Sequence, residues 1–163
     1  MKEEIMELTA YCGLVCRDCL RYRGKVPDAA RTLLSEMERR KFDNYAEMKM
    51  KFDKRFENYV VFIDVLRKIA ELGCDKSCRK GGGCSSFECP IVQCCLEQKY
   101  EGCWQCDQRA SCNKFDFLQP FHGETPKNNC AYLHDNGFDN FIAHKQAFYI
   151  WDDKERTAGK PSE

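Results

Sequence analysis

The sequence feature that most constrains this chain is a cysteine-rich segment in its middle, residues 74–112. The segment carries nine of the thirteen cysteines, at positions 74, 78, 84, 89, 94, 95, 103, 106 and 112. Few large apolar side chains separate these cysteines, so the segment cannot bury enough apolar surface to fold on its own. It therefore needs cross-links, and the candidates are disulfide bonds, zinc ions or an iron–sulfur cluster.

The composition narrows the setting in which such a chain works. Its 163 residues suit one domain with a modest core, and its 26 basic and 26 acidic side chains balance. A balanced charge does not indicate a nucleic acid or an anionic membrane as partner. The first residues lack the apolar region of a secretory signal, and no stretch approaches the roughly 20 apolar residues of a membrane helix. We therefore expect a cytoplasmic protein without a membrane partner.

A cytoplasmic location would make some of these cross-links less common than others. Thiols stay reduced in the cytoplasm, where disulfide bonds are rare. The odd number of cysteines, thirteen, also fits a complete set of disulfide pairs poorly. Both points favour a bound metal over disulfide bonds.

The first motif lies near the N-terminus, where Cys12-x3-Cys16-x2-Cys19 offers three thiolates within a short stretch. A tetrahedral zinc site needs a fourth ligand, which we expect from the region between Cys74 and Cys89. Such a site would tie the N-terminus to the cysteine-rich segment. The alternative is that these cysteines are buried or idle thiols.

The strongest metal motif is Cys103-x2-Cys106, followed by Cys112. A C-x2-C turn presents two thiolates to one zinc ion at about 2.3 Å. We expect these three cysteines to share one tetrahedral site with Cys94 or Cys89. A thioredoxin-like redox pair would require a neighbouring βαβ pattern, which the sequence does not show.

Together the motifs predict eleven metal ligands, enough for two or three sites: Cys12, Cys16, Cys19, Cys74, Cys78, Cys84, Cys89, Cys94, Cys103, Cys106 and Cys112. Cys95 is left as the candidate for a reactive thiol, since adjacent cysteines rarely bind one ion together. Cys130 and His134 stand four residues apart, the spacing of a helical ligand pair. We interpret them instead as a partly buried thiol and a surface imidazole.

The region before the cysteine-rich segment has helical periodicity and predicts a helical hairpin over residues 26–73. The first helix begins near Pro27, and the turn falls near Phe42 to Asn44. The second helix runs from about Tyr45 to Leu72 and is ended by Gly73 in the left-handed conformation. Its apolar side chains recur in steps of four and three, a pattern typical of core packing: Phe52, Phe56, Tyr59, Ile63, Leu66 and Ala70.

Further short helices are expected after this hairpin. Pro90 suits the first position of a helix that reaches about Tyr100. Pro120 interrupts an apolar stretch over residues 115–121, Asn128 or Asn129 caps a helix that Gly137 ends, and residues 138–151 form an amphipathic helix. Strands should be short or absent.

The expected fold is therefore mainly α: a helical hairpin and short C-terminal helices around a cysteine-rich, irregular core held by metal. We expect a single domain over residues 1–163. Its parts are the N-terminal cysteine cluster (1–25), the hairpin (26–73), the cysteine-rich block (74–112), the C-terminal helices (113–152) and a frayed tail (153–163).

The order of the cysteine motifs resembles a known family. The chain has Cys12-Gly13-Leu14-x-Cys16-x2-Cys19, a helical insert, Cys89-x-Ile91-x2-Cys94, Cys103-x2-Cys106 and Cys112. This order is similar to that of a bacterial and archaeal cysteine-rich family catalogued as a domain of unknown function. The resemblance extends from about Ala10 to Trp151, because residues 136–141 are similar to the start of the family's closing helix.

The resemblance implies a cysteine-bound metal, taken to be zinc, and no established activity. The chain departs from the family pattern in the wide spacings from Cys74 to Cys78 and from Cys84 to Cys89, and in the additional Cys95. The roles of Cys74, Cys78, Cys84 and Cys95 are therefore the least well defined by the resemblance.

We therefore expect a small cytoplasmic zinc-binding protein whose metal sites are structural and whose partner is an unidentified protein. Closed thiolate sites contribute roughly 10 kcal/mol or more to folding in zinc-finger peptides, which suits a segment with little apolar surface to bury. The alternative is an iron–sulfur protein in electron transfer or redox sensing. The N-terminal motif has the cysteine spacing of radical-SAM enzymes, but the chain lacks the length and strands for their barrel, and ferredoxin spacing is absent.

Overall fold

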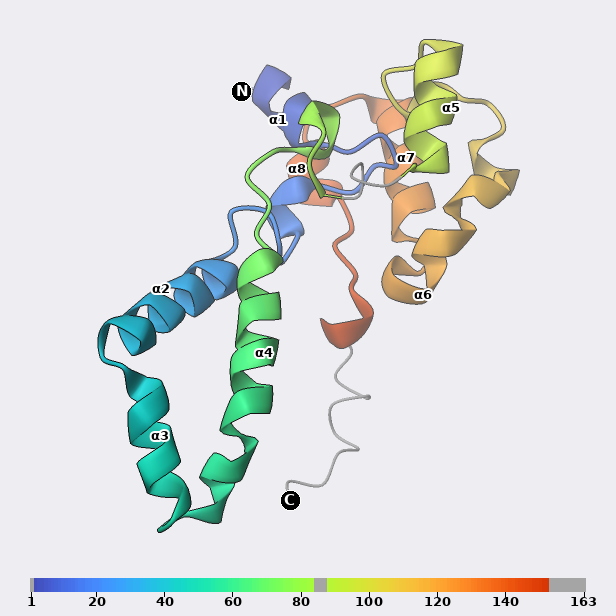
Figure 1. The fold of residues 1–163 in the computed structure, drawn as a ribbon. Coiled ribbons are helices and arrows are strands. Elements are labelled where there is room, and N and C mark those ends of the chain that lie inside the picture. The colour runs from blue at the N-terminus through green and yellow to red at the C-terminus, as the bar shows by residue number, and fades with distance from the viewer. Residues whose placement is uncertain (1, 84–87, 153–163) are drawn as a thin grey trace. The chain divides into compact units, whose positions relative to one another are not determined.

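The computed structural model describes residues 2–83 and 88–152 of the chain. The mainly α fold is confirmed, because the described residues form α-helices and short 3-10 helices, labelled α and η, with isolated β-bridges in place of strands. The chain divides into two compact units, unit 1 (Met1–Asp18 and Lys76–Glu163) and unit 2 (Cys19–Asp75). Figure 1 shows their helices. Among the described residues, no helix is long and apolar enough to cross a membrane.

Unit 2 consists of α2 (Lys25–Arg39), α3 (Phe42–Met50), η2 (Lys54–Asn58) and α4 (Tyr59–Glu71). Helices α2 and α4 pack side by side, while α3 and η2 connect them at one end (Figure 1). Arg40 and Lys41 form the turn between α2 and α3, and Lys41 adopts the left-handed conformation with φ of 51°. The turn thus falls just before the predicted residues.

The prediction of one helix from Tyr45 to Leu72 is wrong, because α3 ends at Met50 and α4 begins at Tyr59. Asp53 between them is extended, and its carboxylate accepts a hydrogen bond from the backbone N–H of Arg55 (3.1 Å). An aspartate that bonds the backbone in this way caps a new helix and ends the regular path of the preceding one. Phe52, which the apolar pattern placed in the core, is 80% exposed.

The core of unit 2 is small. Ile63 and Leu66 of α4 are buried, as are Ala30 of α2 and Ala46 of α3. The prediction of a left-handed Gly73 after α4 is also wrong, because Gly73 has no positive φ.

Gly73 instead leaves room for a side chain of α2. A Cβ atom at Gly73 would lie 2.6 Å from Nη1 of Arg31, which donates a hydrogen bond to the carbonyl oxygen of Ala70 (2.6 Å). The first and last residues of unit 2 meet beside this contact. Cys74 donates its backbone N–H to Arg21 (2.9 Å) and accepts from that of Arg23 (3.0 Å), which closes the unit by backbone pairing.

Unit 1 is built from many short elements. They are α1 (Lys2–Leu8), η1 (Cys16–Asp18), η3 (Cys78–Lys80), α5 (Pro90–Gln98), η5 (Cys103–Gln105), η6 (Arg109–Ser111), η7 (Asn113–Leu118), α6 (Gln119–His122), α7 (Thr125–Asn136), α8 (Phe141–His144) and η8 (Ile150–Asp152). As predicted, α5 begins at Pro90, and Gly137 ends α7 with a positive φ of 66°. Pro120 stands in the first turn of α6, where the apolar stretch breaks. Helix α1 was not predicted from the sequence pattern.

Unit 1 contains the larger core of the two units. Its buried apolar side chains come from α5, η5, η7, α7, α8 and the turns beside η1 and α7: Val15, Ile91, Trp104, Phe115, Leu118, Leu133, Phe138 and Phe141. Three cysteines, Cys89, Cys95 and Cys130, are buried within the same cluster. The cysteine-rich segment therefore shares its core with the C-terminal helices, which supply the large apolar side chains that it lacks.

The prediction of a helix over residues 138–151 is wrong beyond α8, since residues 145–149 have no regular secondary structure. The reason lies in Asn129, one of the two residues expected to cap α7, which is buried within that helix. Its amide donates to the carbonyl oxygens of Gly13 and Gln146 (3.0 Å each), and its Oδ1 accepts from the backbone N–H of Gln146 (2.7 Å). These bonds satisfy the backbone of Gln146 without a helix. Phe148 and Trp151 are correspondingly exposed rather than buried.

Candidate metal centre

The main concentration of thiols in unit 1 surrounds one cavity of about 330 Å³, part of which is open to solvent. Five cysteines line it, and they come from α5, η5 and the chain on either side of η6: Cys94, Cys95, Cys103, Cys106 and Cys112. Ile91, Tyr100 and Phe115 complete the wall with Arg109 and Lys114. The predicted ligands Cys94, Cys103, Cys106 and Cys112 are thus brought to a single place.

The C-x2-C motif forms the tight turn that its spacing predicts. Cys103 opens η5, and the backbone N–H of Cys106 donates to the carbonyl oxygen of Cys103 (3.1 Å). Gln105 braces the turn by accepting from the backbone N–H of Glu101 (2.7 Å) and donating to the Glu101 carboxylate (3.1 Å). Cys112 lies in extended backbone between η6 and η7. Local hydrogen bonds therefore fix the backbone of the motif.

Helix α5 decides which of its cysteines belongs to the cavity. Cys89 is the N-cap of α5 and is buried in the apolar core, whereas Cys94 lines the cavity. Cys95, one residue further, is only 2% exposed, and its Sγ lies 3.8 Å from Sγ of Cys103. Between the two candidates for the fourth ligand, the geometry thus favours Cys94 over Cys89.

The thiols influence one another through the cavity. Burial raises the pKa of Cys94; Lys114 acts against this, and the neighbouring thiols, Cys106 and Cys112 among them, raise the pKa further. A hydrogen bond with Cys130 raises the pKa of Cys103, and a hydrogen bond with Cys103, together with burial, raises that of Cys95. Neighbouring thiols thus raise one another's pKa and disfavour the thiolate form. A bound divalent cation would lower these pKa values, because its positive charge stabilises thiolates.

The donors share a cavity without converging on one point. Across residues 2–83 and 88–152, no three His, Cys, Asp or Glu side chains are arranged so that they could hold a metal ion. A thiol needs only a change of its χ1 rotamer to redirect Sγ. The donor set therefore fits a thiolate-bound metal in kind and location, and closure around an ion requires the side chains to turn inward.

The other predicted ligands are distributed over both units. In unit 1 the backbone N–H of Cys78 donates to Sγ of Cys16 (3.4 Å). Cys12 is partly buried beside the core of unit 1. Cys19 and Cys74 belong to unit 2, where Cys74 is fixed by its backbone pairing. Cys84 lies outside the described residues.

The contacts of four further residues near the cavity were not predicted from the sequence. Arg109 and Lys114 line the cavity, and Arg109 donates from Nη1 to the carbonyl oxygen of Cys106 (3.1 Å). Cys130 is completely buried, whereas a partly buried thiol was predicted. His134 is exposed, as predicted, but its Nδ1 lies 2.8 Å from the carbonyl oxygen of Trp104. Spacing on α7 could not reveal these contacts, because their partners lie far away in the sequence.

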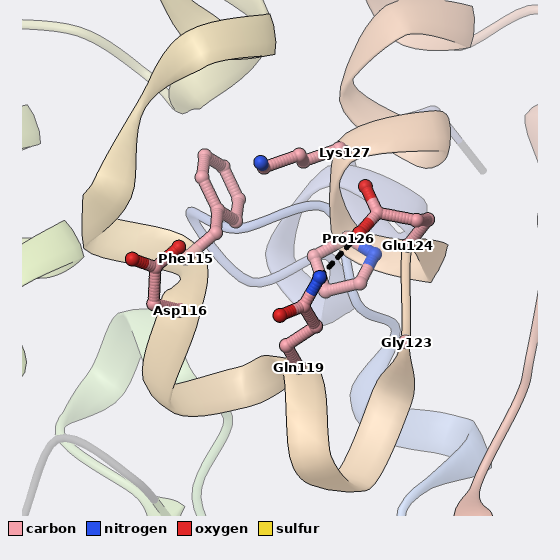
Figure 2. A pocket seen from close by; sticks show the side chains of 7 residues that line it. All are labelled: Phe115, Asp116, Gln119, Gly123, Glu124, Pro126 and Lys127. Carbon is pink, nitrogen blue, oxygen red and sulfur yellow. Dashed lines mark hydrogen bonds between the residues drawn. The ribbon is translucent and has the colours of Figure 1, made fainter.

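A second cavity, of about 190 Å³ including open solvent, lies between η7 and the start of α7. Figure 2 shows its lining, in which Nε2 of Gln119 donates to Oε1 of Glu124 (2.7 Å). Asp116 and Lys127 also line it, and none of the lining residues is a cysteine. It is therefore a small polar recess, separate from the thiol chemistry.

Fold and centre define a small helical protein with a cysteine-lined cavity. The chain belongs to the family described as Protein of unknown function (DUF3795), which matches residues 8–117. No curated protein and no solved structure matches it. The family resemblance seen in the cysteine motifs is thus confirmed, but the match ends at Phe117. The similarity expected for residues 136–141 lies outside it.

Proposed function

We propose that this chain is a zinc-binding protein in which Cys94, Cys103, Cys106 and Cys112 hold one structural metal ion. The observation that supports this most directly is the single cavity that these four thiols line. Four thiolates are a common donor set of closed, structural zinc sites. When bound, the metal would supply cross-linking rather than chemistry, and it would fasten α5 to the η5–η7 segment.

The cations at the cavity support the same proposal. A zinc ion with four thiolates carries two negative charges in excess, and Arg109 and Lys114 line the same cavity. Nearby cations lower the cost of holding thiolates in a partly buried place. The protein would work in the cytoplasm, where thiols stay reduced, and present the surface of unit 1 to a protein partner.

Metal analysis of Cys→Ser variants tests the proposal. The protein is stripped with a chelator, reloaded with Zn²⁺ under reducing conditions and analysed for bound zinc. Cys94→Ser and Cys106→Ser should each lose about one ion per chain, because a closed site loses most of its affinity with one ligand. Cys89→Ser, at the other end of α5, is the matched control and should keep it. Full zinc content in Cys106→Ser, with unchanged protease resistance, would contradict the proposal.

A second candidate is an iron–sulfur cluster in the same cavity. The observation that favours it is that five thiols line one cavity without converging on a single point, as a one-ion site would require. Cysteine thiolates are also the usual ligands of such clusters. Anaerobic purification separates the two candidates: zinc gives a colourless protein, whereas a cluster gives a brown one with stoichiometric iron and sulfide.

A further inference from the structure

Outside the cavity, a second pair of cysteines lies together in unit 1. The backbone N–H of Cys78 donates to Sγ of Cys16 at 3.4 Å, although 62 positions separate the two residues. Cys16 begins η1 and Cys78 begins η3, so each cysteine stands at the start of a tight turn. Hydrogen bonds from amides to sulfur stabilise thiolates and are a regular feature of cysteine-bound metal centres.

Arg79 fixes the turn that carries Cys78. Its Nε donates to the carbonyl oxygens of Met6 (2.9 Å) and Thr9 (2.8 Å), and Nη2 donates to that of Glu101 (2.6 Å). Its guanidinium also lies over the rings of Tyr11 (4.6 Å) and Trp104 (5.4 Å). A planar, multidentate side chain held by so many partners allows little movement. The contact between the Cys78 and Cys16 segments is therefore built into the fold.

The loop that carries Cys12 is fixed in the same part of unit 1. Tyr11 accepts a hydrogen bond at its carbonyl oxygen from the backbone N–H of Cys103 (2.8 Å). Gly13 has a φ of 82°, and a Cβ atom there would lie 3.0 Å from Sγ of Cys130. Cys12 lies between these two anchored residues, so its backbone has a defined place in unit 1.

A buried hydroxyl beside Cys78 lacks a hydrogen-bond partner. Ser77 is 1% exposed, and in the described part of the chain its Oγ has no partner. An unpaired buried hydroxyl destabilises the folded state, because it has lost its hydrogen bonds with water. A thiolate ligand that turned towards this hydroxyl would accept a hydrogen bond from it and remove the destabilisation.

We propose that Cys16 and Cys78 bind a second metal ion, with Cys12 as a third thiolate and the Ser77 hydroxyl as a hydrogen-bond donor to the site. The sequence leaves the partner of the N-terminal motif open between Cys74 and Cys89, and the hydrogen bond from the backbone N–H of Cys78 to Sγ of Cys16 favours Cys78. Binding of Zn²⁺ would release one proton from each thiol that ligates it. The inference rests on the proposed function only in taking zinc as the metal.

Zinc stoichiometry tests this second site. Wild-type protein reloaded with Zn²⁺ should hold two ions, and Cys78→Ser should hold one. Cys78→His should hold two, since an imidazole replaces a thiolate as a zinc ligand. Two ions in Cys78→Ser, or one in Cys78→His, would overturn the proposal. Cys106→Ser removes the cavity site alone and should hold one ion, whereas the double variant Cys106→Ser/Cys78→Ser should hold no zinc. The zinc content of the two single variants therefore shows which of the two proposed sites is wrong.

Ser77→Ala provides a second test that leaves every thiol in place. It should weaken Zn²⁺ binding about 10- to 100-fold in competition with a chelator, because the site loses a hydrogen-bond donor. It should at the same time raise the thermal stability of metal-free protein, because the unpaired hydroxyl is gone. Unchanged affinity together with raised stability would show that Ser77 serves no metal site and would overturn its assigned role.

Discussion

The two units of this protein are held together in different ways. Unit 2 has longer helices, a small core at Ile63 and Leu66, and side-chain contacts that mostly join residues a few positions apart, such as Arg39 with Glu36. Unit 1 has short elements connected across long sequence distances. Its Asp18 and Lys145 form an ion pair whose side chains are 23% and 11% exposed. Regular helices satisfy their own backbone, whereas irregular turns depend on distant partners.

The cysteines that line the cavity lie in the unit with the short elements. All five cysteines around the cavity, and the pair Cys16 and Cys78, belong to unit 1. Short 3-10 turns stabilise little structure by themselves, so a metal ion adds most where such turns must be held together. We expect the two units to respond differently when metal, core or surface contacts are removed.

The largest expected effect is that of metal removal. A chelator should open residues 88–112 to protease and to amide hydrogen exchange, because a structural site contributes roughly 10 kcal/mol or more to folding. Helices α2 and α4 should keep their protection, since unit 2 would lose no cavity ligand. Hydrogen exchange read by mass spectrometry compares the units directly. An equal loss of protection in unit 1 and unit 2 would show that the two units do not differ in their dependence on metal.

The next effect is expected in the core of unit 1. Phe141 is fully buried beside Phe138 and Tyr132, with ring centroids at 6.0 and 6.1 Å. Phe141→Ala should lower the free energy of unfolding by about 3–5 kcal/mol, through lost burial and a residual cavity. Phe148→Ala is the control, since Phe148 is 41% exposed and its loss should change stability by about 0.5 kcal/mol or less. Denaturant titration of the zinc-loaded protein measures both.

A smaller effect is expected from the corresponding change in unit 2. Leu66→Ala should cost about 2 kcal/mol, the lower end for such substitutions, because the core of unit 2 is small and two of its buried residues, Ala30 and Ala46, are alanines. Val65→Ala, one position away and 53% exposed, serves as the control. Zinc content should be unchanged in both variants. A loss of zinc in Leu66→Ala would contradict the independence of the two units.

The smallest effect concerns the Tyr59 hydroxyl, which donates to the Asp43 carboxylate (2.5 Å). Burial and this hydrogen bond raise the pKa of Tyr59 to about 12. The folded state favours the protonated phenol. The contribution of the Tyr59 hydroxyl to the free energy of unfolding is therefore complete below about pH 10 and is lost as the pH rises towards 12. Tyr59→Phe should cost about 1 kcal/mol or less at pH 8. Stability at pH 8 and pH 11 should differ less in this variant than in wild type.

The helices were largely predictable because their signals are local. Pro90 and Gly137 mark the start of α5 and the end of α7, and apolar spacing indicated the buried Ile63 and Leu66. The predictions failed where a side chain competes with helical bonding. Asp53 caps a new helix inside the predicted one, and Asn129 bonds the backbone of Gln146 across 17 positions. The pattern of a single sequence does not show a hydrogen bond between residues that far apart, such as Asn129 and Gln146.

The candidate sites divide in the same way. The sequence by itself determined the donor type, the C-x2-C turn at Cys103 and Cys106, and the mainly α fold, because each depends on residues a few positions apart. Only the tertiary structure decided that Cys94 rather than Cys89 lines the cavity, and that Cys78 meets Cys16. These choices depend on how distant segments pack around Arg79 and the apolar core, and the energy of that packing comes from the whole fold.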